Sequence, residues 1–186
     1  VLGWSRRYEQ ARTPDVPDFR YVMDWLKAEM PADLAPCIIH NDFRFDNLVY
    51  DHRDTSRIIG VLDWEMATVG DPLMDLGGSL AYWIEAADPY CWRLFRRQPT
   101  HLPGMLSRDE LIDYYLNKRN LSVDNRKFYY IFGLFRLAVI IQQIYYRYYH
   151  NQTRNPQFKV FGIAANMLET FCRKLIHSKA QHLSQH

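Results

Sequence analysis

Residues 38–51 read IIHNDFRFDNLVYD, and they place a dense polar cluster between two short apolar runs. Asp42 and Asn47 stand out, because a carboxylate and an amide five residues apart can point at one small volume across a tight loop. The alternative interpretation is a surface turn in which Asp and Asn side chains hydrogen-bond nearby backbone groups. The flanking runs have the composition of short strands, so the sequence predicts a strand, a polar loop and a second strand.

The spacing His40-x-Asp42-x-x-x-x-Asn47 is that of the catalytic loop of protein kinases, with Asn41 at the position of the arginine. Phosphoryl transfer from a nucleotide requires a carboxylate that takes the proton of the acceptor hydroxyl, and oxygen ligands for Mg²⁺. We therefore interpret Asp42 as the catalytic base and Asn47 as a metal ligand.

Another apolar run, 58–62, ends in Asp63-Trp64-Glu65, where kinases carry a metal-binding aspartate after a strand. Asp63 is the second predicted ligand, since Mg²⁺ commonly uses one or two carboxylates beside phosphate oxygens. Glu65 is either an additional ligand, direct or through water, or a carboxylate at the start of a helix. Further along, Asp71 is predicted to cap a helix, and Asp75 is predicted to accept hydrogen bonds from the loop around His40.

Two segments, 39–48 (IHNDFRFDNL) and 61–77 (VLDWEMATVGDPLMDLG), together resemble the aminoglycoside phosphotransferase and choline kinase family. This family shares the protein-kinase fold and phosphorylates small hydroxylated molecules. The loop sequence and Tyr82-Trp83 are most similar to the branch related to the kinase-like domains attached to acyl-CoA dehydrogenases. The resemblance is sharp over 36–84, and over the remaining helical part it is a matching order of elements.

The resemblance implies ATP as co-substrate and Mg²⁺ as cofactor. It implies that Asp42 is the base, that Asn47 and Asp63 bind Mg²⁺, and that His40 and Asp75 brace the loop.

Other loop residues are assigned less directly. Arg44 and Asp46 either contact phosphate or substrate, which would place Arg44 among the catalytic residues, or form a local ion pair on the rim. Asn41 departs from the glycine common at its position in the family, and asparagine tolerates unusual backbone angles better than most residues.

Composition supports an ordinary globular domain. The chain has 186 residues, 48% of them hydrophobic and 24% charged, with a formal net charge of +2. This balance gives no reason to expect nucleic acid or a membrane as partner. The three cysteines are far apart and form no C-x-x-C pair, which argues against a disulfide framework or a zinc site. We expect a cytoplasmic protein, and the sequence leaves its oligomeric state open.

The predicted elements give an α+β fold that is mostly α. Short strands near 38–39, 47–50 and 58–62 precede a series of helices, and the aromatic-rich segment 123–150 is expected to pack in the core rather than form a stacking platform. The helices are predicted at 18–30, with Asp18 as cap and Pro31 as stop, then at 72–84, 89–98, 107–117, 123–150 and 155–177.

The nucleotide-covering lobe of a kinase has no counterpart in the sequence. Before Asp42 there is one glycine, Gly3, and one lysine, Lys27, and no G-x-G-x-x-G occurs anywhere in the chain. We therefore expect 1–186 to be a single domain, the C-terminal catalytic lobe of a longer protein, and to be inactive without its N-terminal lobe.

Three functions fit the sequence. The first is an ATP-dependent kinase for a small hydroxylated molecule, and the second is a kinase-like module that binds a ligand or partner without catalysis. The third, a metal-dependent hydrolase, would require more histidine ligands than His40 alone. The presence of Asp42, Asn47 and Asp63 together favours the kinase. The aromatic and basic 123–150 segment disfavours a polycationic antibiotic, and the branch resemblance suggests a hydroxyacyl-CoA-type acceptor.

Overall fold

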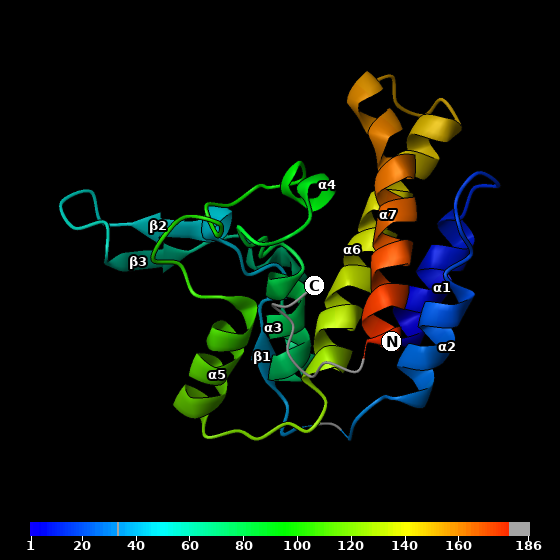
Figure 1. The fold of residues 1–186 in the computed structure, drawn as a ribbon. Helices are drawn as coiled ribbons and strands as arrows, with labels where there is room; N and C mark the ends of the chain where they lie inside the picture. The colour runs from blue at the N-terminus through cyan, green and yellow to red at the C-terminus, as the bar shows by residue number, and fades with distance from the viewer. Residues whose placement is uncertain (33, 179–186) are drawn as a thin grey trace.

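The computed structural model describes residues 1–32 and 34–178, and it is an α+β fold dominated by helices (Figure 1). This confirms the fold class that the sequence predicts. The helices are α1 (Leu2–Ala11), α2 (Arg20–Ala28), α3 (Pro72–Leu80), α4 (Tyr90–Arg93), α5 (Arg108–Arg119), α6 (Arg126–Tyr149) and α7 (Val160–His177). The strands are β1 (Cys37–Ile39), β2 (Leu48–Tyr50), β3 (Ile58–Val61) and β4 (Thr68–Gly70), with 3₁₀ turns at Phe45–Asn47, Trp64–Met66 and Pro156–Lys159.

Helix α6 is the centre of the core. It runs beside α7 and packs against α3 and the N-terminal helices α1 and α2 (Figure 1). Its apolar side chains Phe128, Ile131 and Phe135 are fully buried, so this part of the aromatic segment packs in the core as expected, whereas Tyr149 at the end of the helix is exposed. Tyr8 and Phe19 complete an aromatic cluster with Phe135, at ring-centroid distances of 4.8 to 6.1 Å.

Helix α6 is also long and apolar enough to span a membrane by length and composition alone. However, 72% of its most apolar window is buried against the rest of the protein. A helix that is apolar all round and covered by other helices behaves as a core helix.

The strands form two separate antiparallel pairs that carry the polar loops. In the first pair, Ile38 of β1 lies opposite Val69 of β4. In the second, Leu48 of β2 lies opposite Val61 of β3, and a turn over residues 51–57 closes this hairpin. Strand β4 could not be predicted from the sequence, because its three residues become a strand only through pairing with β1, about thirty positions earlier in the chain.

Several predicted boundaries were wrong. The helix predicted at 72–84 ends at Leu80, the one at 89–98 is a single turn, and the one at 155–177 begins with a 3₁₀ turn. The cap of α2 is Phe19 in a left-handed conformation, although the Asp18 carboxylate does accept a hydrogen bond from the Arg20 amide. Asp71 caps α3 as predicted, and Ser107 and Glu110 form a capping box at the start of α5.

Candidate active site

The loop after β1 turns sharply at Asn41, and α3 holds it there. Asn41 has a left-handed backbone with φ of 66°, which asparagine tolerates better than most residues. The Asp75 carboxylate accepts hydrogen bonds from the backbone N–H groups of His40 at 2.8 Å and Asn41 at 2.7 Å. Asp75 therefore occupies the bracing position that the sequence predicts for it.

His40 is a buried bracing residue and not a ligand-facing one, since only 4% of it is exposed. The backbone N–H of Asp42 donates to its Nδ1 at 3.2 Å, and its Nε2 lies 2.7 Å from the carbonyl oxygen of Leu62. The two contacts fit the neutral ring with its proton on Nε2. The ring also packs on Trp64 with centroids 4.7 Å apart. His40 thus ties the loop to the segment that carries Asp63.

Asp42 and Asn47 lie in direct contact. The Asn47 amide nitrogen donates to the Asp42 carbonyl oxygen at 2.7 Å and to Asp42 Oδ2 at 3.2 Å. Arg44 donates to the same Oδ2 at 3.0 Å, and its second nitrogen lies 3.7 Å from Asp46. Oδ1 of Asp42 accepts no hydrogen bond from the residues that the structure describes. One oxygen of the carboxylate is therefore anchored, and the other can take a proton.

The backbone brings Asp63 beside Asn47. The N–H of Leu62, the residue before Asp63, donates to the Asn47 carbonyl oxygen at 2.8 Å. Asp63 itself is exposed and has a left-handed backbone with φ of 67° at the start of the 3₁₀ turn Trp64–Met66. Glu65 is also exposed within this turn. Its role as a metal ligand stays a prediction.

The arrangement is compatible with a magnesium ion. In the described part of the chain, no three His, Cys, Asp or Glu side chains gather into a metal site of their own. Magnesium in phosphotransferases needs fewer, because it binds one or two protein oxygens plus phosphate oxygens. Since the Asn47 amide nitrogen points at Asp42, its Oδ1 points elsewhere. That oxygen and the exposed Asp63 carboxylate are the donor types that Mg²⁺ takes.

Further residues contact the loop although they were not predicted as site residues. Arg136 of α6 donates to the Asn41 carbonyl oxygen. The buried Gln98 accepts from the Phe45 amide at 2.9 Å and donates to the Tyr82 carbonyl at 3.4 Å. The Arg44 guanidinium lies over the Tyr82 ring, 4.9 Å from its centroid. Burial raises the pKa of Tyr82, and the positive charge of Arg44 opposes that rise.

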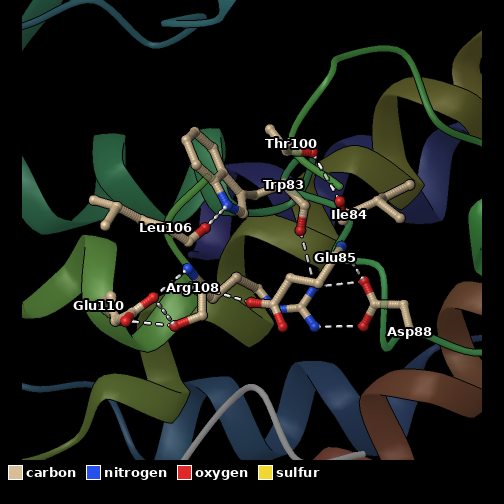
Figure 2. Close-up of polar contacts among 9 residues, drawn as sticks. Trp83, Ile84, Glu85, Asp88, Thr100, Leu106, Arg108 and Glu110 are labelled. Atoms are coloured by element: carbon tan, nitrogen blue, oxygen red, sulfur yellow. Dashed lines mark hydrogen bonds and ion pairs between the residues drawn. The ribbon is translucent and has the colours of Figure 1, made fainter. Parts of the chain in front are cut away.

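A buried ion pair fixes the segment after α3 (Figure 2). Arg108 donates to both carboxylate oxygens of Asp88 and to the Trp83 carbonyl, while its backbone N–H donates to Glu85. The indole of Trp83 in turn donates to the Leu106 carbonyl at 2.8 Å. Loss of either partner would leave a buried charge without its counter-ion, so both residues are needed to hold the segment in place.

This segment forms one wall of an apolar hollow beside the loop, with a volume of about 350 Å³. Arg44, Asp46 and Tyr82 line the end nearest the loop. The opposite walls are apolar side chains of α6 and α7, among them Ile140, Ile144, Met167 and Leu168. Arg44 therefore contacts both the hollow and the carboxylate of Asp42.

Comparison with known proteins adds the following findings. A family model described as "Phosphotransferase enzyme family" matches residues 1–111. Acyl-CoA dehydrogenase family member 10 of Mus musculus is 36% identical over 149 residues, covering 79% of this chain and 14% of that protein. Acyl-CoA dehydrogenase family member 11 of Homo sapiens is 33% identical over 175 residues, covering 91% of this chain and 22% of that protein. The chain thus spans less than a quarter of the length of these relatives.

Among solved structures, a crystal structure of a protein assigned as an aminoglycoside phosphotransferase from Ralstonia eutropha superposes with a TM-score of 0.78. The sequence identity is 26%, and the superposition covers 94% of this chain and 53% of that chain.

Proposed function

Because this chain belongs to the phosphotransferase enzyme family, we propose that it transfers the γ-phosphoryl group of ATP to a hydroxyl of a small molecule. The family and the kinase-like fold of its structural neighbour agree with the resemblance seen in the sequence. The nucleotide donor, the acceptor and the role of each residue are our proposal. The observation that carries it is the direct contact between Asp42 and Asn47, with Asp63 held beside them.

Asp42 acts as the general base. Its Oδ2 is anchored by Arg44 and Asn47, so its Oδ1 is free to accept the proton of the acceptor hydroxyl. The hydroxyl oxygen then forms a bond to the γ-phosphorus, while the bond from that phosphorus to the β–γ bridging oxygen breaks and ADP leaves. Holding the base in one rotamer before the substrate arrives lowers the entropic cost of reaching the reactive geometry.

Asn47 Oδ1 and the Asp63 carboxylate would hold Mg²⁺. When bound, the ion neutralises the charge of the phosphate oxygens. Glu65 is a further candidate ligand in the same turn. Arg44, which sits between Asp42 and the hollow, is placed to meet negative charge on the transferring group or on the acceptor.

The hollow beside the loop is the proposed acceptor site. Asp46 is the one acid among the described residues that line it, whereas Arg44 and Arg97 are both basic. A polycationic aminoglycoside would need several carboxylates, which this lining lacks. The isoleucine and methionine side chains favour an apolar chain instead. We therefore propose a hydroxylated acceptor with an acyl chain, such as a hydroxyacyl-CoA-type metabolite.

Purified full-length protein tests the chemistry. With Mg²⁺·ATP, we expect phosphorylation of hydroxyacyl acceptors, with kanamycin as the comparison substrate in a parallel assay. Asp42→Asn should reduce kcat by roughly 10²- to 10⁴-fold, the usual contribution of a general base. Asp24→Asn, at an exposed position of α2, is the matched control and should have no effect.

Calorimetry separates donor binding from catalysis. Asp63→Asn should weaken Mg²⁺-dependent ATP binding, whereas Asp42→Asn should leave it largely intact. A clear preference for kanamycin would refute the proposed acceptor class. Absence of Mg²⁺·ATP binding in folded full-length protein would instead support a kinase-like module without catalysis.

A further inference from the structure

The side chain of Arg136 lies in the protein interior, in the middle of the core helix α6. Only 5% of the residue is exposed. Its guanidinium donates a hydrogen bond to the Asn41 carbonyl oxygen and lies over the Trp4 ring, 5.2 Å from the centroid. Its Nε has no hydrogen-bond partner among the described residues. A cation in this position reaches the catalytic loop from a helix that is 95 residues away in the sequence.

The carbonyl that Arg136 binds belongs to the peptide group joining Asn41 to Asp42. The N–H of the same peptide group donates to Nδ1 of His40. One peptide plane is therefore held at its oxygen by Arg136 and at its hydrogen by His40. Because this plane ends at the Cα of Asp42, its orientation fixes the position of that Cα and the direction of its N–Cα bond, from which the side chain of Asp42 extends.

The neighbouring helix leaves room for this contact. Gly78 of α3 faces the guanidinium, and a Cβ at this position would lie 2.6 Å from Nη1 of Arg136. The titratable groups around the guanidinium come from several elements, and they include Asp42, Asp75, Tyr82 and Arg44. Burial lowers the pKa of Arg136, and the carboxylates of Asp42 and Asp75 oppose that shift.

We propose that Arg136 is a positioning residue for the base, and that it couples the helix lining the acceptor hollow to the peptide that orients Asp42. The same helix carries Ile140 and Ile144, one and two turns further along, which line the hollow. This inference rests on the proposed phosphoryl transfer.

The stability and the activity of a variant at Arg136 together distinguish a positioning role from a purely structural one. Burial of the guanidinium costs free energy that a methionine side chain does not cost, and this difference offsets the hydrogen bond lost to the Asn41 carbonyl. Arg136→Met in full-length protein should therefore remain folded with a similar Tm. Its kcat should fall by about 10- to 100-fold, since small misplacements of a reacting group have effects of that size, while the KM for ATP changes little.

Further variants test the proposal even if Arg136→Met fails to fold. Arg136→Lys retains one donor and should restore part of kcat. Gly78→Ala keeps the arginine but displaces its tip, and it should lower kcat as well. Arg147→Met, at an exposed position of the same helix, is the control and should match wild-type protein. Added guanidinium ion should raise kcat of Arg136→Ala but not of the wild type.

Hydrogen exchange of the Asp42 amide supplies a readout that does not need turnover. Exchange should be faster in Arg136→Met and Gly78→Ala than in wild-type protein, and unchanged in Arg147→Met. If the wild-type protein has no phosphotransferase activity, the proposed function fails while the exchange result still tests the positioning. If the Asp42 amide exchanges in Arg136→Met and Gly78→Ala at the same rate as in wild-type protein, the inference is refuted. A wild-type kcat in Arg136→Met would refute it equally.

Discussion

Helices α3 and α6 approach each other most closely at two glycines, and Gly133→Ala tests how much the fold depends on this approach. A Cβ on Gly133 would lie 1.9 Å from the Gly77 carbonyl oxygen and 2.5 Å from its carbonyl carbon. The atoms that would be struck are backbone, so no side-chain rotation can relieve the overlap. The two helices would have to move apart.

The size of the effect follows from the distances. Real Cβ atoms essentially never approach closer than 3.0 Å, so the backbones must separate locally by about 1 Å. Overpacking of a core typically costs 1–3 kcal/mol, and a clash with backbone belongs at the upper end, about 3 kcal/mol. Alanine in place of glycine stabilises a helix by about 1 kcal/mol, because its helix propensity is higher. The expected net loss of unfolding free energy is therefore about 2 kcal/mol.

Thermal and urea unfolding measure this loss. A destabilisation of about 2 kcal/mol corresponds to a Tm lower by roughly 4–8 °C for a protein of this size. Gly3→Ala is the control, because it also lies in a helix but a Cβ there would meet nothing within 4 Å, so it should be neutral or stabilising. If Gly133→Ala changes stability with the same sign and size as Gly3→Ala, the close approach of the two helices is not as described.

Three other predictions concern buried groups. Arg108→Met leaves the carboxylate of Asp88 buried without its cation, and urea unfolding should show a loss of about 3–5 kcal/mol; a loss below about 1 kcal/mol would contradict the burial of the pair. The hydrogen bond that Tyr145 donates to an aspartate raises its pKa from 10.0 to about 12. Its contribution to stability is therefore complete below pH 10 and is lost as the pH rises toward 12, so the stability difference from Tyr145→Phe should shrink between pH 9 and pH 11, and a constant difference would refute the assignment. Maleimide labelling followed by mass spectrometry should modify the exposed Cys91 in native protein but the buried Cys172, whose thiol pKa burial raises, only after unfolding.

Local sequence was sufficient to locate the loop. The polar groups of 40–47 follow one another at fixed spacing, and the turn they form is specified by residues within that stretch. The contact between Asp42 and Asn47 was predictable for this reason. The bracing role of Asp75 was also predictable, because a carboxylate on the inner face of a helix requires hydrogen-bond donors, and the nearest are the backbone amides of the loop.

Non-local partners could not be predicted in the same way. Strand β4 is three residues long and has no pattern of its own, so only its pairing with β1 defines it. Arg136 reads in the sequence as one basic residue among many aromatic ones. A signal was present, since Phe135 and Ala138 on either side are apolar and core-like, and an arginine among such residues requires a buried acceptor. The sequence does not reveal which acceptor it meets.

Most of the groups that hold the loop act on its backbone, while Arg44 and Asn47 hold Oδ2 of Asp42. Asp75 binds two amides, His40 and Arg136 hold the two ends of one peptide, and the Asn41 side chain donates to the Met66 carbonyl at 2.9 Å. The backbone contacts set the position of Asp42, and the two bonds to Oδ2 set its rotamer, so Oδ1 stays free to exchange a proton. These contacts come from the loop itself, from α3 and α6, and from the 3₁₀ turn after β3, so the position of Asp42 depends on segments that are far apart in the sequence.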